Sequence, residues 1–178
     1  MKKNISHLNN RGFSLLLAVL ISSLIMTIGL GIFNLTLKEA ALSAASRESQ
    51  FGLYAADSGI ECALYWDVGA HPGGDVFVIA ADGTAGPISC AGNSNITVSR
   101  TRDLVANAAT STFTYNFDGS ADADKDILCV TVNVAKFQCG GGGTRTTIEG
   151  RGYNTCDPNN SHRIERGLYV KYGPTGCN

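Results

Sequence analysis

The sequence predicts an α+β protein: one long N-terminal helix, transmembrane in its first half, packed on an antiparallel β-sheet domain stabilised by disulfides. Three observations support this. An uncharged apolar run begins near the N-terminus, short alternating runs fill the second half of the 178 residues, and all six cysteines follow the apolar run. Charged residues make up 16% of the chain and the net charge is −1. This composition excludes a disordered charged chain and makes a generic nucleic-acid binder unlikely.

The first element is a basic leader followed by an apolar helix. Residues 1–12 contain Lys2, Lys3 and Arg11 but no acid, and the run Phe13–Leu37 contains no ionisable side chain. As a helix this run is long enough to cross a hydrocarbon core of about 30 Å. The basic flank predicts a cytoplasmic N-terminus and an exported remainder, so the chain would cross the cytoplasmic membrane once.

Other targeting signals fit this segment less well. A secretory signal peptide has a shorter apolar core and a small-residue cleavage site, and neither is present. A lipoprotein signal needs a cysteine near the end of the run, whereas the first cysteine is Cys62. A static membrane anchor remains an open alternative.

The helix is expected to continue through residues 38–67 as an amphipathic segment. This stretch contains no proline, and small or apolar residues recur three and four apart. They are Leu42, Ala45, Ser49, Leu53, Ala56, Ile60 and Ala63. One continuous helix of about 55 residues follows, and its second half would dock on the globular domain. Gly29 and Gly31 are expected either to weaken the helix locally or to permit close helix–helix approach.

Residues 68–178 read as a β-rich extracytoplasmic domain, because glycine and proline interrupt short apolar or alternating runs. The predicted strands are Val76–Ala80, Ile96–Arg100, Thr112–Phe117, Ile127–Phe137, Thr144–Tyr153 and Arg163–Tyr172. The last three should form an antiparallel meander whose first turn is Gly140–Gly143. Val130, Val132 and Val134 should share one face of their strand.

The six cysteines predict a disulfide framework, because they are even in number, lie on the exported side and lack C-x-x-C spacing. They are Cys62, Cys90, Cys129, Cys139, Cys156 and Cys177. A hairpin centred in Gly140–Gly143 brings Cys129 near Cys156. A second turn near Pro158 brings Cys177 near Cys139, which leaves Cys62 with Cys90 by elimination. A slip in register would change these pairs, and free buried thiols remain the alternative.

An acidic segment is the one weak candidate for a metal site. Oxygen ligands that suit Ca²⁺ gather at Asp118, Asp122, Asp124 and Asp126, but the spacing is not that of an EF-hand. A solvated acidic turn is the simpler interpretation, and we expect no cofactor.

Nothing in the sequence points to catalysis. Asp57 and Glu61 lie four apart on one helical face, which is more typical of a solvated or interdomain surface than of an acid/base pair. The three histidines are scattered and no nucleophile motif is present. We therefore expect that the protein is not an enzyme.

The residues Arg11-Gly12-Phe13-Ser14, with a basic leader before them and an apolar helix after them, resemble the processing signal of type IV prepilins. The resemblance implies that a prepilin peptidase cuts after Gly12 and methylates the new N-terminal Phe13. The helix would then be retained as the filament core, with Phe13, Leu17, Leu24, Gly29 and Gly31 on it.

Two further features refine this resemblance. Most pilins have glutamate at the fifth mature position, where this chain has Leu17, and its absence is typical of minor pilins at or near a filament tip. The segment Tyr54–Glu61 and the hairpin Thr147–Val170 resemble minor pilins of pilus assembly, a class that includes the K-type pseudopilins of type II secretion. A pseudopilin, a divergent major pilin and a membrane-anchored extracytoplasmic binding domain remain alternatives.

The resemblance also implies partners and a location. The partners would be other pilin subunits, the prepilin peptidase and the assembly platform of the inner membrane. The precursor would reside in the cytoplasmic membrane, and the mature chain in an extracellular pilus. DNA is an unlikely partner because leader removal makes the chain more acidic, although basic residues gather at Arg145, Arg151, Arg163, Arg166 and Lys171.

Overall fold

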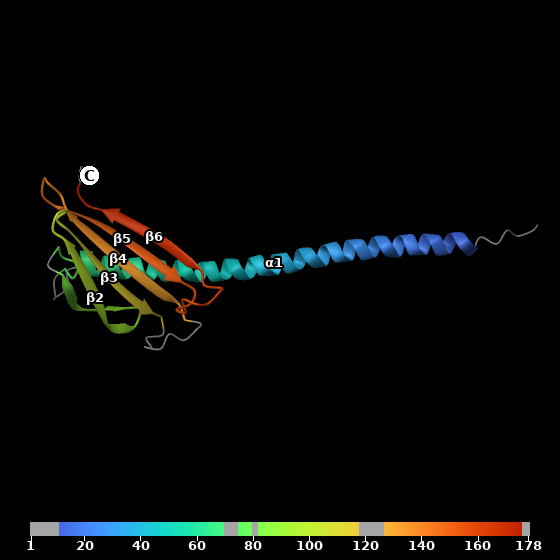
Figure 1. Ribbon diagram of the computed structural model, residues 1–178, viewed down its shortest axis with the longest axis horizontal. Coiled ribbons are helices and arrows are strands. Elements are labelled where there is room, and N and C mark those ends of the chain that lie inside the picture. The colour runs from blue at the N-terminus through green and yellow to red at the C-terminus, as the bar shows by residue number, and fades with distance from the viewer. Residues whose placement is uncertain (1–10, 70–74, 80–81, 118–126, 176–178) are drawn as a thin grey trace, which may run out of the picture. The chain divides into compact units, whose positions relative to one another are not determined.

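One helix and one antiparallel sheet make up the fold, which confirms the predicted α+β class (Figure 1). The computed structural model describes residues 11–69, 75–79, 82–117 and 127–175. The chain divides into two compact units, residues 1–45 and 46–178. Helix α1 (Arg11–Val68) is continuous over 58 residues and belongs to both units. The absence of proline from this stretch allows the uninterrupted helix that the sequence predicts.

The sheet is a meander of six strands, each antiparallel to its neighbours, in the order β1-β2-β3-β4-β5-β6. The strands are β1 (Gly83–Cys90), β2 (Asn93–Asp103), β3 (Ala108–Asn116), β4 (Cys129–Gln138), β5 (Thr144–Tyr153) and β6 (Glu165–Tyr172). The predicted hairpin tip at Gly140–Gly143 is confirmed. Gly142 and Gly143 have φ angles of 87° and 88°, a region that favours glycine.

The first predicted strand is wrong. Residues 76–79 form bends rather than a strand, and Phe77 enters the core from there. The first strand of the structure is β1, which lies in a stretch where Gly83, Gly86 and Pro87 predict turns. β1 is an edge strand, so Pro87 can sit there without breaking a ladder on both sides. The pairing of β1 with β2 shifts register between Ala85 and Ile88, as expected where proline interrupts an edge.

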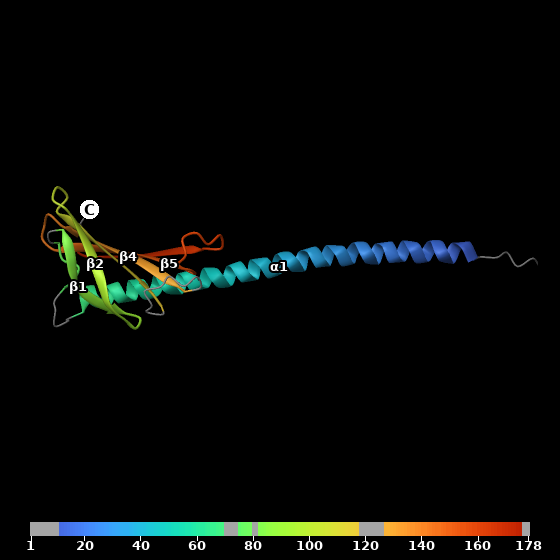
Figure 2. The same cartoon turned by 60° about the horizontal axis from the view of Figure 1, so that its bottom comes forward.

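The core lies between the sheet and the second half of α1 (Figure 2). Val130, Val132 and Val134 are fully buried on one face of β4, as their alternation predicts. Phe113 stacks between Phe77 and Tyr115, with ring centroids 5.8 and 6.4 Å away. The remaining buried core members are Ile60, Ala63, Ile88, Cys90, Ile96, Val98 and Ile148.

The face of α1 that meets the sheet differs from the predicted stripe. Ala56, Ile60 and Ala63 are buried as expected, but Leu53 is 40% exposed. The helix instead presents its smallest residues, and Gly52, Ala55 and Gly59 are buried too. The sheet approaches so closely here that a leucine would not fit between helix and strands.

Glycines on both elements make this close approach possible. A Cβ added to Gly59 would lie 2.5 Å from Cγ2 of Val130, and one added to Gly150 would lie 2.6 Å from the carbonyl oxygen of Ala56. A Cβ on Gly52 would be 3.2 Å from the carbonyl oxygen of Gly152. Helix α1 and strand β5 therefore pack backbone against backbone, while the valine side chains of β4 pack directly on the helix at Gly59.

Disulfides fasten both elements. Cys62–Cys90 joins α1 to β1 with a Cα–Cα distance of 5.8 Å, and Cys129–Cys156 joins β4 to the segment after β5 with 5.3 Å. These are two of the three predicted pairs. Cys139 is also disulfide-bonded, and its predicted partner Cys177 lies outside the described residues. Each bond is expected to contribute about 2–4 kcal/mol, mainly by restricting the unfolded chain.

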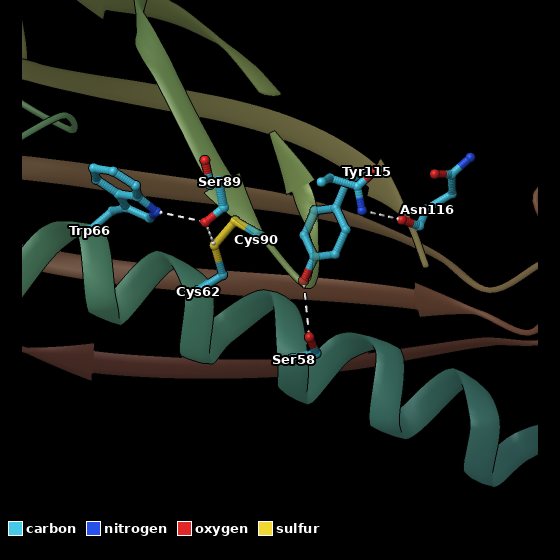
Figure 3. Close-up of a disulfide and its surroundings, with 8 residues drawn as sticks. Ser58, Cys62, Trp66, Ser89, Cys90, Tyr115 and Asn116 are labelled. Atoms are coloured by element: carbon cyan, nitrogen blue, oxygen red, sulfur yellow. Dashed lines mark hydrogen bonds between the residues drawn. A yellow bond between two sulfur atoms is a disulfide. The ribbon is translucent and has the colours of Figure 1, made fainter. Parts of the chain in front are cut away.

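Hydrogen bonds surround the disulfide that holds the helix (Figure 3). Nε1 of Trp66 donates to the carbonyl oxygen of Ser89 at 3.1 Å, one residue before Cys90. The hydroxyls of Ser58 and Tyr115 lie 3.1 Å apart. Burial raises the pKa of Tyr115, against the opposing effect of the Ser58 hydrogen bond. The tyrosine is therefore a neutral, structural group at physiological pH.

We predict that Gly150→Ala destabilises the protein by about 1–3 kcal/mol, because the new methyl group must displace the backbone of α1. Urea unfolding of the full chain in detergent, followed by the fluorescence of Trp66, measures this loss. Gly167→Ala is the matched control, since a Cβ there meets no atom within 4 Å. Equal stability of the two variants would show that helix and sheet are not in backbone contact.

Candidate functional site

The apolar part of α1 is uncovered on all sides in its own unit. Its most apolar 18-residue window has a mean hydropathy of 2.5, and none of that window is buried. Phe13 is 73% exposed, and Leu17 and Leu24 are about half exposed. Side chains of this size each gain about 1.5–3 kcal/mol on leaving water. The described residues thus contain one helix that is long and apolar enough to cross a membrane.

The short polar side chains in this segment are satisfied by their own helix. Ser22 donates to the carbonyl oxygen of Ala18 at 2.7 Å, and Ser23 to that of Leu20 at 2.8 Å. Thr27 and Thr36 make the same kind of bond one turn back along the helix. Because each hydroxyl keeps a hydrogen bond in hydrocarbon, these residues do not oppose membrane insertion.

Gly29 and Gly31 leave open surface on the helix. A Cβ added to either would meet no atom within 4 Å. Residues two apart lie on nearly opposite sides of a helix. Each glycine therefore offers a different side at which another helix could approach closely.

The predicted cleavage position lies in the first turn of α1, which begins at Arg11. The first four N–H groups of a helix have no partner within it, so little hydrogen bonding is lost when this turn unwinds. Gly12 adds conformational freedom next to the bond in question. The junction between Gly12 and Phe13 can thus become extended, as a peptidase cleft requires.

The other candidate residues from the sequence are the acidic segment and the pair Asp57 and Glu61. Asp118, Asp122, Asp124 and Asp126 lie outside the described residues. Among residues 11–69, 75–79, 82–117 and 127–175, no group of three or more His, Cys, Asp or Glu is placed to hold a metal. Asp57 and Glu61 are exposed side chains of α1.

The basic residues of the C-terminal hairpin are engaged within the domain. Arg151 pairs with Glu149 at 2.8 Å and with Glu165 at 3.3 Å. The guanidinium of Arg163 lies 3.8 Å from the ring centroid of Tyr153, and Nε of Arg166 donates to Ser49. Arg151, Arg163 and Arg166 therefore each have a partner within the domain.

One charged cluster was not foreseen from the sequence, and it fastens the end of α1 to the sheet. Lys136 on β4 is buried, and its ammonium group contacts the carboxylates of both Asp67 and Asp75. The hydroxyl of Tyr172 on β6 donates to the other oxygen of Asp67. Asp67 lies in the last turn of α1, where the helix dipole disfavours a carboxylate. The cation and the hydroxyl offset that unfavourable position.

The alternation of inward-facing residues in β4 could have indicated this cluster from the sequence. Lys136 continues the buried series of Val130, Val132 and Val134, so the strand pattern puts a lysine on the apolar face. A buried ammonium group needs an anionic partner. The sequence cannot show which acids supply it, because Asp67 and Asp75 reach Lys136 only through the fold.

Comparison of the chain with models of known protein families, with curated proteins and with solved structures finds no match.

We predict that Lys136→Met lowers the free energy of unfolding by about 3–5 kcal/mol at neutral pH, because the buried carboxylate of Asp67 loses its counter-charge. Urea unfolding monitored by Trp66 fluorescence gives the value. Lys171→Met, at an exposed position, should change stability by no more than about 0.5 kcal/mol. A Lys136 variant as stable as the Lys171 variant would contradict a structural role for the cluster.

A second prediction concerns alkaline pH. Burial, and then the hydrogen bond to Asp67, raise the pKa of Tyr172 above its ordinary value of 10.0. The folded state then holds this proton more tightly than the unfolded state. The resulting stabilisation is complete below pH 10 and is lost as the pH rises toward the folded pKa. The stability difference between the native chain and Tyr172→Phe should therefore shrink from about pH 9 to pH 11. A constant difference in urea unfolding over this range would refute it.

Proposed function

We propose that this chain is the precursor of a type IV pilin-like subunit, specifically a minor pilin. The observation that carries the proposal is the bare apolar segment of α1, which directly follows Gly12 and continues without a break into the helix on which the sheet packs. A subunit of this kind needs a helix that can leave the bilayer and enter a bundle of like helices. A cleaved signal peptide does not need such continuity.

Processing would be a hydrolysis of the peptide bond between Gly12 and Phe13 by a prepilin peptidase. Residues 1–12 leave with the new carboxylate of Gly12, and Phe13 gains a free amine that is then methylated. Removal of Lys2, Lys3 and Arg11 deletes the charges that hold the N-terminus in the cytoplasm. The membrane helix can then move outward as the assembly platform adds the subunit to a filament.

Assembly would depend on helix packing rather than on burial from water, because lipid tails are as apolar as leucine. Small residues permit the close approach that such packing needs, and Gly29 and Gly31 supply it on two sides of α1. The interaction partners are other pilin subunits. A type II secretion pseudopilus would use the same surface.

Leu17 favours a minor rather than a major subunit. The segment Phe13–Leu37 has no carboxylate, so it cannot neutralise the N-terminal amine of a neighbouring subunit. A buried amine without a counter-charge is costly. A subunit at the filament tip would have no such amine to neutralise, and this position suits the chain.

Mass spectrometry of the N-terminal peptide from native cells tests the proposal. We expect a chain that begins at N-methylated Phe13. Gly12→Val should block cleavage and accumulate the precursor in the membrane, because the bulk of the valine side chain would not fit a narrow protease cleft that a residue without a Cβ can enter. Gly31→Val makes the same substitution inside the helix and should be processed normally.

Two results would overturn the proposal. One is a native chain that still begins at Met1, which would identify a static membrane anchor carrying an extracytoplasmic domain. The other is normal cleavage of Gly12→Val. Absence of the processed chain from sheared filaments, while it remains in the membrane, would exclude incorporation into a pilus.

A further inference from the structure

A hollow of about 380 Å³ lies on the side of the sheet that faces away from α1, between β5 and β6. On β5, Gly150 and Gly152 face the helix, so the alternate residues Thr147, Glu149 and Arg151 point to the opposite side. The lining residues are Thr147, Glu149, Gly167, Leu168, Tyr169 and Lys171. β6 is the last strand of the sheet, so the hollow opens at its edge.

The missing side chain of Gly167 creates the hollow. Gly167 precedes Tyr169 by two residues on the same face of β6, opposite Arg151. A Cβ added there would meet no atom within 4 Å. Tyr169 is 71% exposed. The ring thus borders an open space large enough for a small planar group.

Polar groups are held around this ring. Lys171 lies on the other side of Tyr169 from Gly167 along the strand, with Nζ 5.6 Å from the ring centroid. Glu149 lies directly opposite Tyr169 in the neighbouring strand. Its carboxylate accepts a hydrogen bond of 2.9 Å from Nε of Arg151, which fixes its position. Glu149, Lys171 and Thr147 thus all line the hollow that the ring borders.

We propose that this hollow binds a pyranose ring of an uncharged oligosaccharide. A pyranose with equatorial substituents has an apolar C–H face, which packs on an aromatic ring, and a rim of hydroxyls, which needs donors and acceptors. Tyr169 supplies the aromatic ring, while Glu149, Lys171 and Thr147 supply the hydrogen-bond donors and acceptors. Glu149 and Lys171 have opposite charges, which favours a neutral ligand.

A peptide added to the sheet edge is the competing occupant. It would bind the backbone groups of β6 at the edge, and it would not need the side chain of Tyr169 or the gap at Gly167. A ligand that lies on the face of the sheet would use both the exposed ring of Tyr169 and the gap at Gly167. We therefore assign the hollow to a sugar.

Saturation-transfer NMR with chitohexaose and cellohexaose tests the assignment on the full chain. The detergent is dodecylphosphocholine, because a detergent with a sugar head group would compete. One ring and a few hydrogen bonds predict a Kd on the order of 1 mM for at least one probe. The precursor itself is used, so the outcome does not depend on cleavage after Gly12 or on filament assembly.

Four variants locate the binding. Tyr169→Ala should weaken it about tenfold and Tyr169→Phe should retain it, because the ring rather than the hydroxyl makes the contact. Gly167→Val should abolish it by filling the hollow, where an added Cβ meets no atom within 4 Å. Tyr54→Ala removes another exposed tyrosine, on α1, and should have no effect.

Three outcomes would overturn the assignment. The first is the absence of binding by either hexasaccharide at about 10 mM. The second is binding that survives both Tyr169→Ala and Gly167→Val, which would place the sugar elsewhere. The third is protection of the β6 edge by an added peptide that is unchanged in Gly167→Val, together with no response to sugar, which would favour strand addition.

Discussion

Backbone contact between α1 and the sheet is the constraint on which the rest of the domain depends. Gly52 and Gly59 on the helix face Gly152 and the valines of β4, with no room for a Cβ between them. A meander of six strands has one apolar face that it cannot bury alone. The second half of α1 covers that face, so the helix is part of the core. This is why the compact unit begins at Ser46, within the helix, and not at the first strand.

The sequence predicts where the helix and strands lie better than it predicts which side of each is buried. Periodicity and the lack of proline are local properties, and they predict α1, β5 and the turn at Gly140–Gly143. Two properties of the fold are not local. Whether Gly and Pro end a strand depends on its place in the sheet, and at an edge β1 tolerates Pro87. Which side of α1 is buried depends on how near the strands come, and this excludes Leu53 in favour of glycine and alanine.

The candidate site residues also fall into two groups, those that a local motif identifies and those that only the fold brings together. Gly12 and Phe13 are adjacent in sequence, so a motif can identify them without a fold. A sequence motif cannot identify side chains that come together only when two strands pair. Glu149 faces Tyr169 because β5 and β6 pair with one particular register. A shift of one residue would turn Tyr169 toward the helix and Val170 toward solvent. The hollow and the Asp67–Lys136 cluster are therefore consequences of register, and residue types alone do not reveal them.

If α1 is anchored in a filament as proposed, any force on the sheet passes through the helix–sheet contact. Packing of glycines supplies little side-chain interlocking, and dispersion between small residues is weak. The stronger connections lie near the end of α1, where Cys62–Cys90 joins helix and edge strand and Lys136 pairs with Asp67. The disulfide is covalent and resists peeling of β1, while the ion pair of Lys136 holds β4 and the hydrogen bond of Tyr172 holds β6. Close packing thus determines where the sheet lies on the helix, and the bonds near Cys62 and Asp67 resist its removal.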